Sequence, residues 1–166
     1  MAVVYNYKES LTGDDLTWYQ QRIDILEIGV CPFKLTDDQW THDIKQWPNL
    51  SLEAVYAYLI DKPTNQPTAN QGGTASSAYK ALKAEAYSIA GKLQPIQHRF
   101  VRDQHIFLAK AVIYPSYSST KKPYAAWVAI DKKRCEVLFG HCSCIAGLVY
   151  LFLTWGGLIV IQSYTP

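Results

Sequence analysis

The sequence has little excess charge and few cysteines, and each shortage excludes a class of protein. Its 16 basic and 14 acidic residues leave a net charge of +2, which by itself is too small to indicate nucleic-acid binding. Its four cysteines include two that are separated by a single residue, unlike the disulfide framework of a small secreted domain. The N-terminus also lacks a basic segment followed by an apolar signal core. We therefore expect reduced thiols and a nuclear or cytoplasmic protein.

Motifs of catalysis are missing as well. The chain has no Gly-x-Ser-x-Gly elbow, no phosphate-binding glycine loop and no His-Glu-x-x-His pair. Two acidic pairs, at 14–15 and 37–38, lie at expected helix starts, where negative side chains interact favourably with the helix dipole. The neighbours His141 and Cys142 have no third group nearby in the sequence to orient a thiol nucleophile. We therefore expect a protein that is not an enzyme, and we identify no small-molecule substrate.

The chain is nevertheless long and apolar enough to form a globular core, because 49% of its 166 residues are hydrophobic and 18% are charged. Apolar residues recur at helical spacing after Thr12, at positions 16, 19, 23 and 26. Thr36 and Gln39 form a capping box for a second helix. Residues 61–77 are rich in proline, glycine and polar residues, which predicts a flexible linker. The expected helices cover residues 12–29, 36–47, 51–60 and 78–91.

The pattern changes to that of strands from His105 onward. Three stretches rich in β-branched and aromatic residues are bounded by turn-forming residues. They cover residues 105–114, 124–131 and 134–141. Lys132–Lys133, beside Asp131, predicts a tight hairpin between the last two. Helices followed by a small antiparallel sheet indicate an α+β fold. The expected regions are a helical region at 1–104, a β-rich region at 105–148 and an apolar tail at 149–166.

Cys142 and Cys144 follow the expected hairpin directly and form the main candidate metal site. Thiolates bind zinc strongly, and a hairpin end holds two sulfurs in adjacent coordination positions. The stretch AAWVAIDKKRCEVLFGHCSCIAGL (125–148) resembles the SWIM-type zinc finger. The resemblance extends upstream, for example to CPFKLTDDQW (31–40), in a group of animal SWIM proteins of which some carry a YqaJ-type nuclease domain. It implies that Cys142 and Cys144 bind Zn²⁺ and that the chain interacts with DNA or protein.

The sequence departs from the SWIM pattern in the second half of the ligand set. That half is Cys-x-His, and neither cysteine nor histidine follows Cys144. A structural zinc site normally takes four protein ligands, so two are missing. Cys135 is separated from Cys142 by six residues of expected strand, or about 20 Å. We expect His98 and His105 to be exposed rather than ligands, so the ligand set for Zn²⁺ is incomplete.

Contacts with a DNA or protein partner are expected at the hairpin itself. Lys132, Lys133 and Arg134 form a basic turn, and basic residues attract phosphate and acidic surfaces. Aromatic side chains of the hairpin, such as Tyr124 or Trp127, are further candidates, although Trp127 also suits a core position. These residues define the expected interaction surface.

Residues 149–166 read VYLFLTWGGLIVIQSYTP and replace the expected Cys-x-His pair and its helix. Three interpretations stay open. An apolar run at 145–161 is about 25 Å long as a helix, which approaches the thickness of a membrane and suggests an anchor. Two apolar stretches around Gly156–Gly157 also suit a hairpin. In the third interpretation, the tail is non-native sequence that is read through from an intron of a truncated gene. The alternatives to a zinc module are thus a small membrane-anchored protein or a fragment without function.

Overall fold

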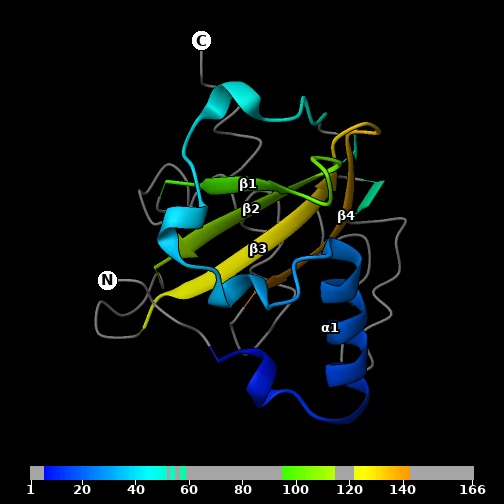
Figure 1. Ribbon diagram of the computed structural model, residues 1–166, viewed down its shortest axis with the longest axis vertical. Helices are drawn as coiled ribbons and strands as arrows, with labels where there is room; N and C mark the ends of the chain where they lie inside the picture. The colour runs from blue at the N-terminus through cyan, green and yellow to red at the C-terminus, as the bar shows by residue number, and fades with distance from the viewer. Residues whose placement is uncertain (1–5, 52, 55–56, 59–94, 115–121, 143–166) are drawn as a thin grey trace.

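The computed structural model describes residues 6–51, 53–54, 57–58, 95–114 and 122–142. These residues form one long helix followed by a four-stranded antiparallel sheet, which confirms the α+β class (Figure 1). The expected linker at 61–77, the expected helix at 78–91 and the tail at 149–166 lie outside the described residues.

Helix α1 spans Gly13–Leu26 and begins where the sequence predicts it. Thr12 has the extended backbone of an N-cap residue, with φ −138°. Three of the four apolar positions, Tyr19, Ile23 and Leu26, are buried, as their spacing on one helical face requires. The helix ends at Glu27, whose left-handed backbone (φ 55°) lets its N–H donate to the carbonyl oxygen of Asp24 at 3.2 Å.

The expected helix at 36–47 is wrong beyond its first turn. The capping box is present, since the Thr36 N–H donates to Oε1 of Gln39 at 3.1 Å, but only the 3-10 helices Asp37–Gln39 and Ile44–Gln46 form. Between them the chain is extended, because Thr41 exchanges two backbone hydrogen bonds with His98, of 2.9 and 2.8 Å. Pairing with the sheet therefore replaces the hydrogen bonds that a longer helix would make.

The expected helix at 51–60 is described only in part. Residues 53–54 are helical, and the Ala54 N–H donates to Oγ of Ser51 at 3.2 Å. This is the geometry of a serine N-cap, so Ser51 begins the element. Positions 52, 55–56 and 59–60 lie outside the described residues.

The sheet has the strand order β1-β2-β3-β4, with every neighbouring pair antiparallel. The three predicted strands are confirmed as β2 (Ile106–Ile113), β3 (Tyr124–Asp131) and β4 (Glu136–Cys142). Strand β1 (Gln97–Val101) was not predicted and falls in the segment that we expected to be helical. It forms one edge of the sheet, and β4 forms the other.

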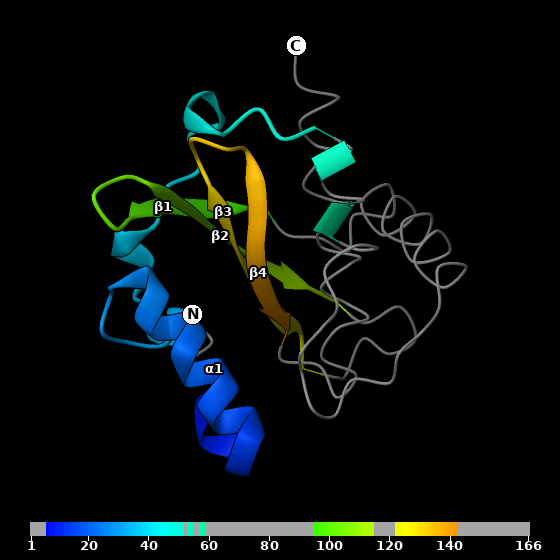
Figure 2. The same cartoon turned by 90° about the vertical axis from the view of Figure 1, so that its right-hand side faces the viewer.

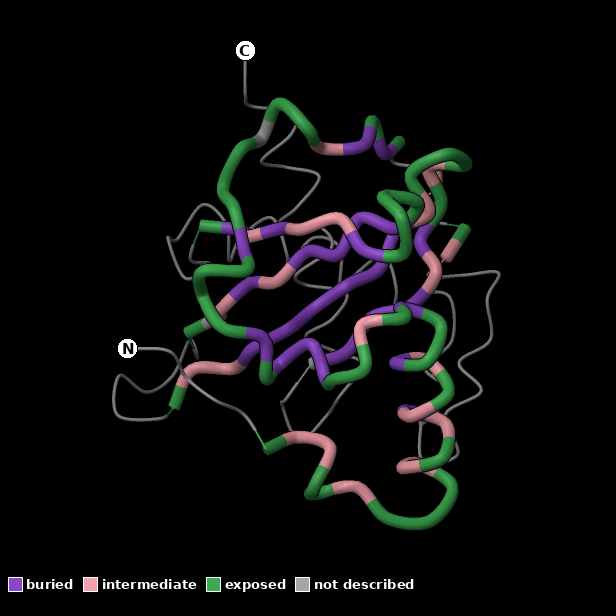
Figure 3. Tube along the Cα trace, viewed as in Figure 1, coloured by how far each residue is buried: buried purple, intermediate pink, exposed green. Residues whose placement is uncertain are grey.

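Both faces of the sheet are covered, and β3 therefore has six consecutive buried residues, 125–130 (Figure 3). Helix α1 lies beside one face, as Figures 1 and 2 show from two directions. The apolar side chains of α1 pack there against Leu108, Trp127 and Phe139. Phe107 and Val128 pack on the opposite face with Leu50 and Ile96. The helix and the sheet thus share one core.

The hairpin turn between β3 and β4 forms as predicted. Oδ1 of Asp131 accepts hydrogen bonds from the backbone N–H groups of Lys133 and Arg134, both at 2.9 Å. Such an aspartate replaces backbone hydrogen bonds in a tight turn. Cys135 completes the turn with a left-handed backbone, φ 53°, and β4 starts at the next residue. The basic residues are consequently held at the rim of the sheet.

Candidate functional site

Cys142 is the last residue of β4 and is paired in register with Ala126 of β3. Its side chain lies outside the described part of the molecule, as does all of Cys144. Of the two predicted zinc ligands, the structure therefore places only the backbone of the first, Cys142. Cys142 lies at the end of an edge strand, at the opposite end of β4 from the basic turn.

His141, directly before Cys142, is held in a cage of aromatic rings. Its side chain is buried, with 3% of its surface exposed. Tyr19 meets it edge-on at 4.5 Å between ring centroids, and Trp18 does so at 4.9 Å. Trp127 lies tilted at 4.9 Å and Tyr7 at 6.2 Å. Edge-to-face contacts of this kind contribute about 0.5–1.5 kcal/mol each beyond burial, so the end of β4 is firmly anchored.

The cage is built by elements far apart in the sequence. Trp127 is the register partner of His141 across β3 and β4, so alternation along both strands puts the two rings on one face. Helix α1 brings Tyr19, whose hydroxyl accepts a hydrogen bond from Nε1–H of Trp127 at 3.2 Å. The same hydroxyl lies 3.0 Å from Sγ of Cys31. One buried tyrosine thus joins the helix, the sheet and the loop after the helix.

The electrostatics of the cage keep its groups uncharged. Burial, and secondarily the positive charge of Arg22, hold the pKa of His141 well below its usual value. Burial raises the pKa of the Tyr19 hydroxyl, and the neighbouring Cys31 raises it further. Burial likewise raises the pKa of the Cys31 thiol. At neutral pH the histidine is therefore an uncharged imidazole and Cys31 is a thiol.

Nε2 of His141 is buried and has no hydrogen-bond partner among the described residues. An orphaned imidazole nitrogen is a frequent metal ligand, but aromatic rings from α1, β3 and the N-terminal segment surround this one. Arg22 closes the same region with its guanidinium 4.0 Å from the ring centroid of Trp18 and 5.0 Å from that of Phe139. A neighbouring cation disfavours a metal ion. His141 is therefore a structural residue that positions the end of β4.

The other candidate ligands are dispersed. The expectation that His98 is exposed is wrong, because its side chain is fully buried. Nδ1 of His98 accepts a hydrogen bond from Nε1–H of Trp47 at 3.0 Å, and the ring stacks on Phe107 at 5.0 Å. His105 is exposed in the turn between β1 and β2, as predicted. Cys135 lies at the opposite end of β4 from Cys142, also as predicted.

Within the described part of the chain, no three His, Cys, Asp or Glu side chains are close enough to hold a metal ion. The first two motif ligands, Cys142 and Cys144, are not included in this statement because their side chains are not described. A complete four-ligand site is therefore not formed by the core of the fold.

The structure removes one residue from the expected partner surface and places that surface away from the cysteine pair. Trp127 is 1% exposed, so its expected role as an exposed contact is wrong and its core interpretation is confirmed. Tyr124 is half-buried at the start of β3. The basic turn residues at 132–134 are exposed, but they lie about 20 Å from Cys142 at the other end of β4. The cysteine pair and the basic turn are separate features.

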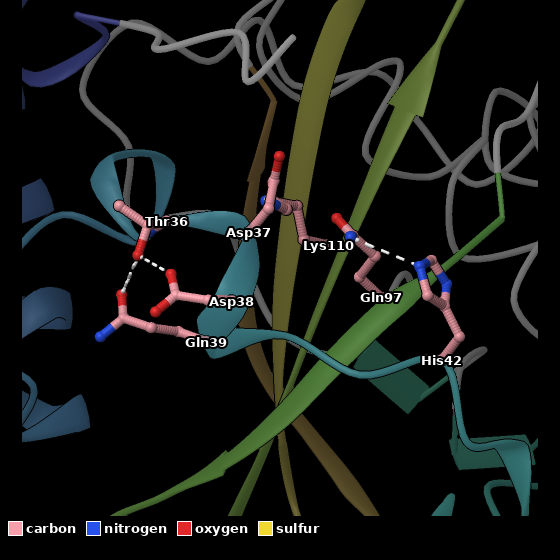
Figure 4. A network of polar contacts seen from close by, with 7 residues as sticks. All are labelled: Thr36, Asp37, Asp38, Gln39, His42, Gln97 and Lys110. Carbon is pink, nitrogen blue, oxygen red and sulfur yellow. Dashed lines mark hydrogen bonds and ion pairs between the residues drawn. The ribbon is translucent and has the colours of Figure 1, made fainter.

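A second group of polar residues lies on the α1 side of the sheet near β1 (Figure 4). Nζ of Lys110, whose side chain is 13% exposed, lies 3.6 Å from Oδ1 of Asp37 and 4.6 Å from the ring centroid of Trp40. Burial lowers the pKa of Lys110, and Asp37 partly opposes this shift. Nearby, Nε2 of Gln97 lies 3.5 Å from Nε2 of His42. These contacts fasten the 36–42 segment over the sheet.

Sequence reasoning missed both of these side-chain groups. A signal for the second was present, because Lys110 is the single charge within the apolar stretch 106–113, and such a charge needs a partner or a snorkelling path. The cage had a weaker signal, the adjacent aromatic residues Trp18 and Tyr19 on an expected helix. Nothing in the sequence indicates that they meet His141.

Comparison of the chain with protein-family models, with curated proteins and with solved structures finds no match in any of the three. The resemblance to SWIM-type zinc fingers therefore stays a prediction drawn from residues 125–148. In the described part of the structure no helix has the length and apolarity needed to cross a membrane. The candidate anchor at 145–161 lies outside that part.

Proposed function

We propose that this chain is a non-enzymatic, zinc-binding interaction module of the SWIM type. Cys142 and Cys144 supply two thiolate ligands. The observation that carries the proposal is the position of the pair: Cys142 ends a paired strand directly after His141, whose ring is buried in the aromatic cage. The first proposed ligand therefore directly follows a buried residue of the sheet that aromatic rings surround.

Anchoring of this kind favours metal binding for an entropic reason. Fixing the backbone of one flexible residue costs about 1–2 kcal/mol of conformational entropy. If the ligands lie at the end of a frayed strand, this cost reduces the free energy of metal binding. The pairing of Cys142 with Ala126 and the burial of His141 mean that folding has already ordered the chain up to the motif. Ligands held by ordered neighbours bind more tightly.

The chemistry of the donor set fits zinc, but only in part. Soft thiolates one residue apart suit Zn²⁺, and bound zinc would supply a structural crosslink. Cys31 is no candidate for a third ligand, because burial raises its thiol pKa and its sulfur contacts the Tyr19 hydroxyl. The module is therefore one half of a tetrahedral site.

The charges of the hairpin favour a protein partner over DNA. The basic turn is flanked by Asp131 and Glu136, and nearby Arg102 forms an ion pair with Glu27 at 3.1 Å. Strong DNA binding draws its affinity from many uncompensated cations. Salt-dependent binding to duplex DNA, with a steep fall between low and physiological salt, would instead indicate a nucleic-acid role.

The test is the zinc content of the reduced, purified protein and of two variants. Cys142→Ser removes a proposed ligand, and Cys135→Ser removes a thiol at the opposite end of the same strand. We expect zinc in the wild type and in Cys135→Ser and a loss of at least tenfold in zinc affinity in Cys142→Ser. Absence of zinc from the folded wild type would refute the proposal. Partitioning of zinc-free protein into detergent micelles would favour the membrane-anchored alternative.

A further inference from the structure

Residues 40–50, which we call the clasp, pass over the edge strand β1 from one face of the sheet to the other (Figure 1). At the N-terminal end of the clasp, Trp40 packs in the core that α1 shares with the sheet. At its C-terminal end, Leu50 is buried in the core of the opposite face, and Trp47 packs against that core. Thr41 exchanges backbone hydrogen bonds with His98 at the edge. The clasp therefore joins the two faces of the sheet across β1.

Different chemistry holds the two ends of the clasp. The ring of Trp40 is contacted by the ammonium group of Lys110, which lies 4.6 Å from the ring centroid. The indole of Trp47 instead donates a hydrogen bond from Nε1–H to Nδ1 of His98 at 3.0 Å. An indole nitrogen can only donate, so Nδ1 of His98 is the acceptor and the neutral imidazole carries its hydrogen on Nε2. The C-terminal end of the clasp thus depends on an uncharged histidine.

Protonation of His98 is incompatible with this arrangement. A protonated imidazole donates from both nitrogens, so Nδ1 would direct a hydrogen at the indole N–H of Trp47. Nε2 gives no compensation, because it is buried and has no hydrogen-bond partner among the described residues. The ring is fully buried, stacked on Phe107 at 5.0 Å between centroids and met edge-on by Phe100 at 5.8 Å. A buried cation without acceptors is strongly unfavourable, and water reaches the ring only if Trp47 moves away.

The charged groups around His98 do not compensate its protonated ring. Burial lowers the pKa of His98, His42 lowers it further, and the charge of Asp43 partly opposes the shift. Both carboxylate oxygens of Asp43 accept hydrogen bonds from other residues of the clasp, and no carboxylate of the described residues forms an ion pair with His98. Lys132 adds positive charge, with Nζ 4.6 Å from the ring centroid of Phe100. Opening of the clasp is therefore the available response to protonation.

We propose that the clasp is a pH-sensitive switch, in which protonation of His98 releases Trp47 and opens residues 43–50, while Trp40 keeps the N-terminal end attached. Opening exposes the apolar face on which Trp47 lies 6.2 Å from Phe107 between ring centroids. The direction follows from the lowered pKa, because the released ring takes up a proton more readily than the buried one. Between about pH 6.5 and the lowered pKa, the ratio of open to closed clasp rises by up to about tenfold for each pH unit of acidification. At neutral pH the clasp is closed.

The experiment measures hydrogen exchange of the Trp47 indole N–H in the full-length chain between pH 7 and pH 5 by NMR, with each rate divided by that of free indole at the same pH. We expect the ratio to rise by up to about tenfold per pH unit below about pH 6.5. Low concentrations of urea should leave it unchanged, because a local opening exposes little surface. The buried indole N–H of Trp127, bonded to the Tyr19 hydroxyl, is the internal control. It should exchange more slowly and respond to urea, since its exchange needs global unfolding.

Variants assign the response to one ring. His98→Asn and His98→Gln remove the titrating group and keep an oxygen acceptor for Trp47, and the folded variants should lose the acid response. His42→Gln is the matched control, because it removes an exposed histidine of the clasp itself, and it should keep the response.

Three results would overturn the switch. One is exchange of Trp47 that does not accelerate with acid in the wild type. Another is an acid response that persists in folded His98→Asn or His98→Gln. The last is exchange of Trp47 and Trp127 at equal rates with equal dependence on urea, which would show that only global unfolding releases Trp47. Since no step involves a metal, these results are independent of the proposed zinc site.

Discussion

Replacing Tyr19 by phenylalanine tests whether the aromatic cage is a hydrogen-bonded unit. The substitution removes one oxygen atom, which accepts the hydrogen bond of Trp127 at 3.2 Å and contacts the Cys31 sulfur at 3.0 Å. Tyr19 is fully buried, so water cannot replace the lost acceptor. Leaving a buried donor without a partner costs about 1–3 kcal/mol. The ring itself, and its contact with His141, is retained.

The expected result is therefore a loss of about 1–3 kcal/mol in the free energy of unfolding, measured by urea denaturation with an unchanged m-value. Tyr114→Phe is the matched control, because the Tyr114 side chain is exposed, and surface substitutions usually change stability by less than about 0.5 kcal/mol. Equal stabilities of the Tyr19→Phe and Tyr114→Phe proteins would refute the account of the cage.

Two further predictions concern a buried histidine and the hairpin turn. Burial lowers the pKa of His98 below its usual value, and the charge of Asp43 partly opposes this shift. Between that lowered pKa and about pH 6.5, the unfolded chain therefore binds more protons than the folded chain. In this window stability falls with decreasing pH by up to about 1.4 kcal/mol per pH unit from this residue. The variant His98→Asn, which keeps an acceptor for Trp47, should show a shallower fall between pH 7 and pH 5 in thermal denaturation, and an unchanged slope would contradict this assignment. Asp131→Ala should destabilise the protein by about 1–2 kcal/mol through loss of the hydrogen bonds from Lys133 and Arg134. Asp131→Asn keeps a side-chain oxygen acceptor and should restore most of that stability. Equal destabilisation by both variants would show that the hydrogen bonds accepted by Oδ1 do not stabilise the turn.

Local signals in the sequence were sufficient to predict α1 and three of the four strands. Helical spacing places Tyr19 and Ile23 on one face whatever they contact, and runs of β-branched and aromatic residues are typical of strands in any sheet. The capping box at Thr36 and the Asp131 turn are equally local, since all of their partners lie within three residues. Features of this kind depend on residues that are neighbours in the sequence, so a local pattern is enough to predict them.

The errors all concern contacts between distant segments. The helix expected at 36–47 is broken because Thr41 pairs with His98, and β1 is a strand because it pairs with β2. Neither pairing leaves a periodic signal in a five-residue segment as polar as β1. His98 similarly looks like a surface residue until Trp47 donates a hydrogen bond to it. Sequence reasoning cannot locate such partners.

In the candidate site, too, the local features could be predicted from the sequence and the contacts between distant segments could not. The cysteine spacing and the hairpin before it are visible in the sequence, and the structure places Cys142 at the end of β4. The role of His141 was not visible, because a histidine next to a cysteine pair resembles a ligand. Only the rings of Trp18, Tyr19 and Trp127 around it identify an anchor instead.

The most direct test of the central claim is the zinc content of the folded, reduced chain after exposure to Zn²⁺, measured alongside Cys142→Ser and Cys135→Ser. The account predicts bound zinc in the wild type and in Cys135→Ser, and its loss in Cys142→Ser. Zinc retained by Cys142→Ser at the wild-type level, or absent from the wild type, would contradict it.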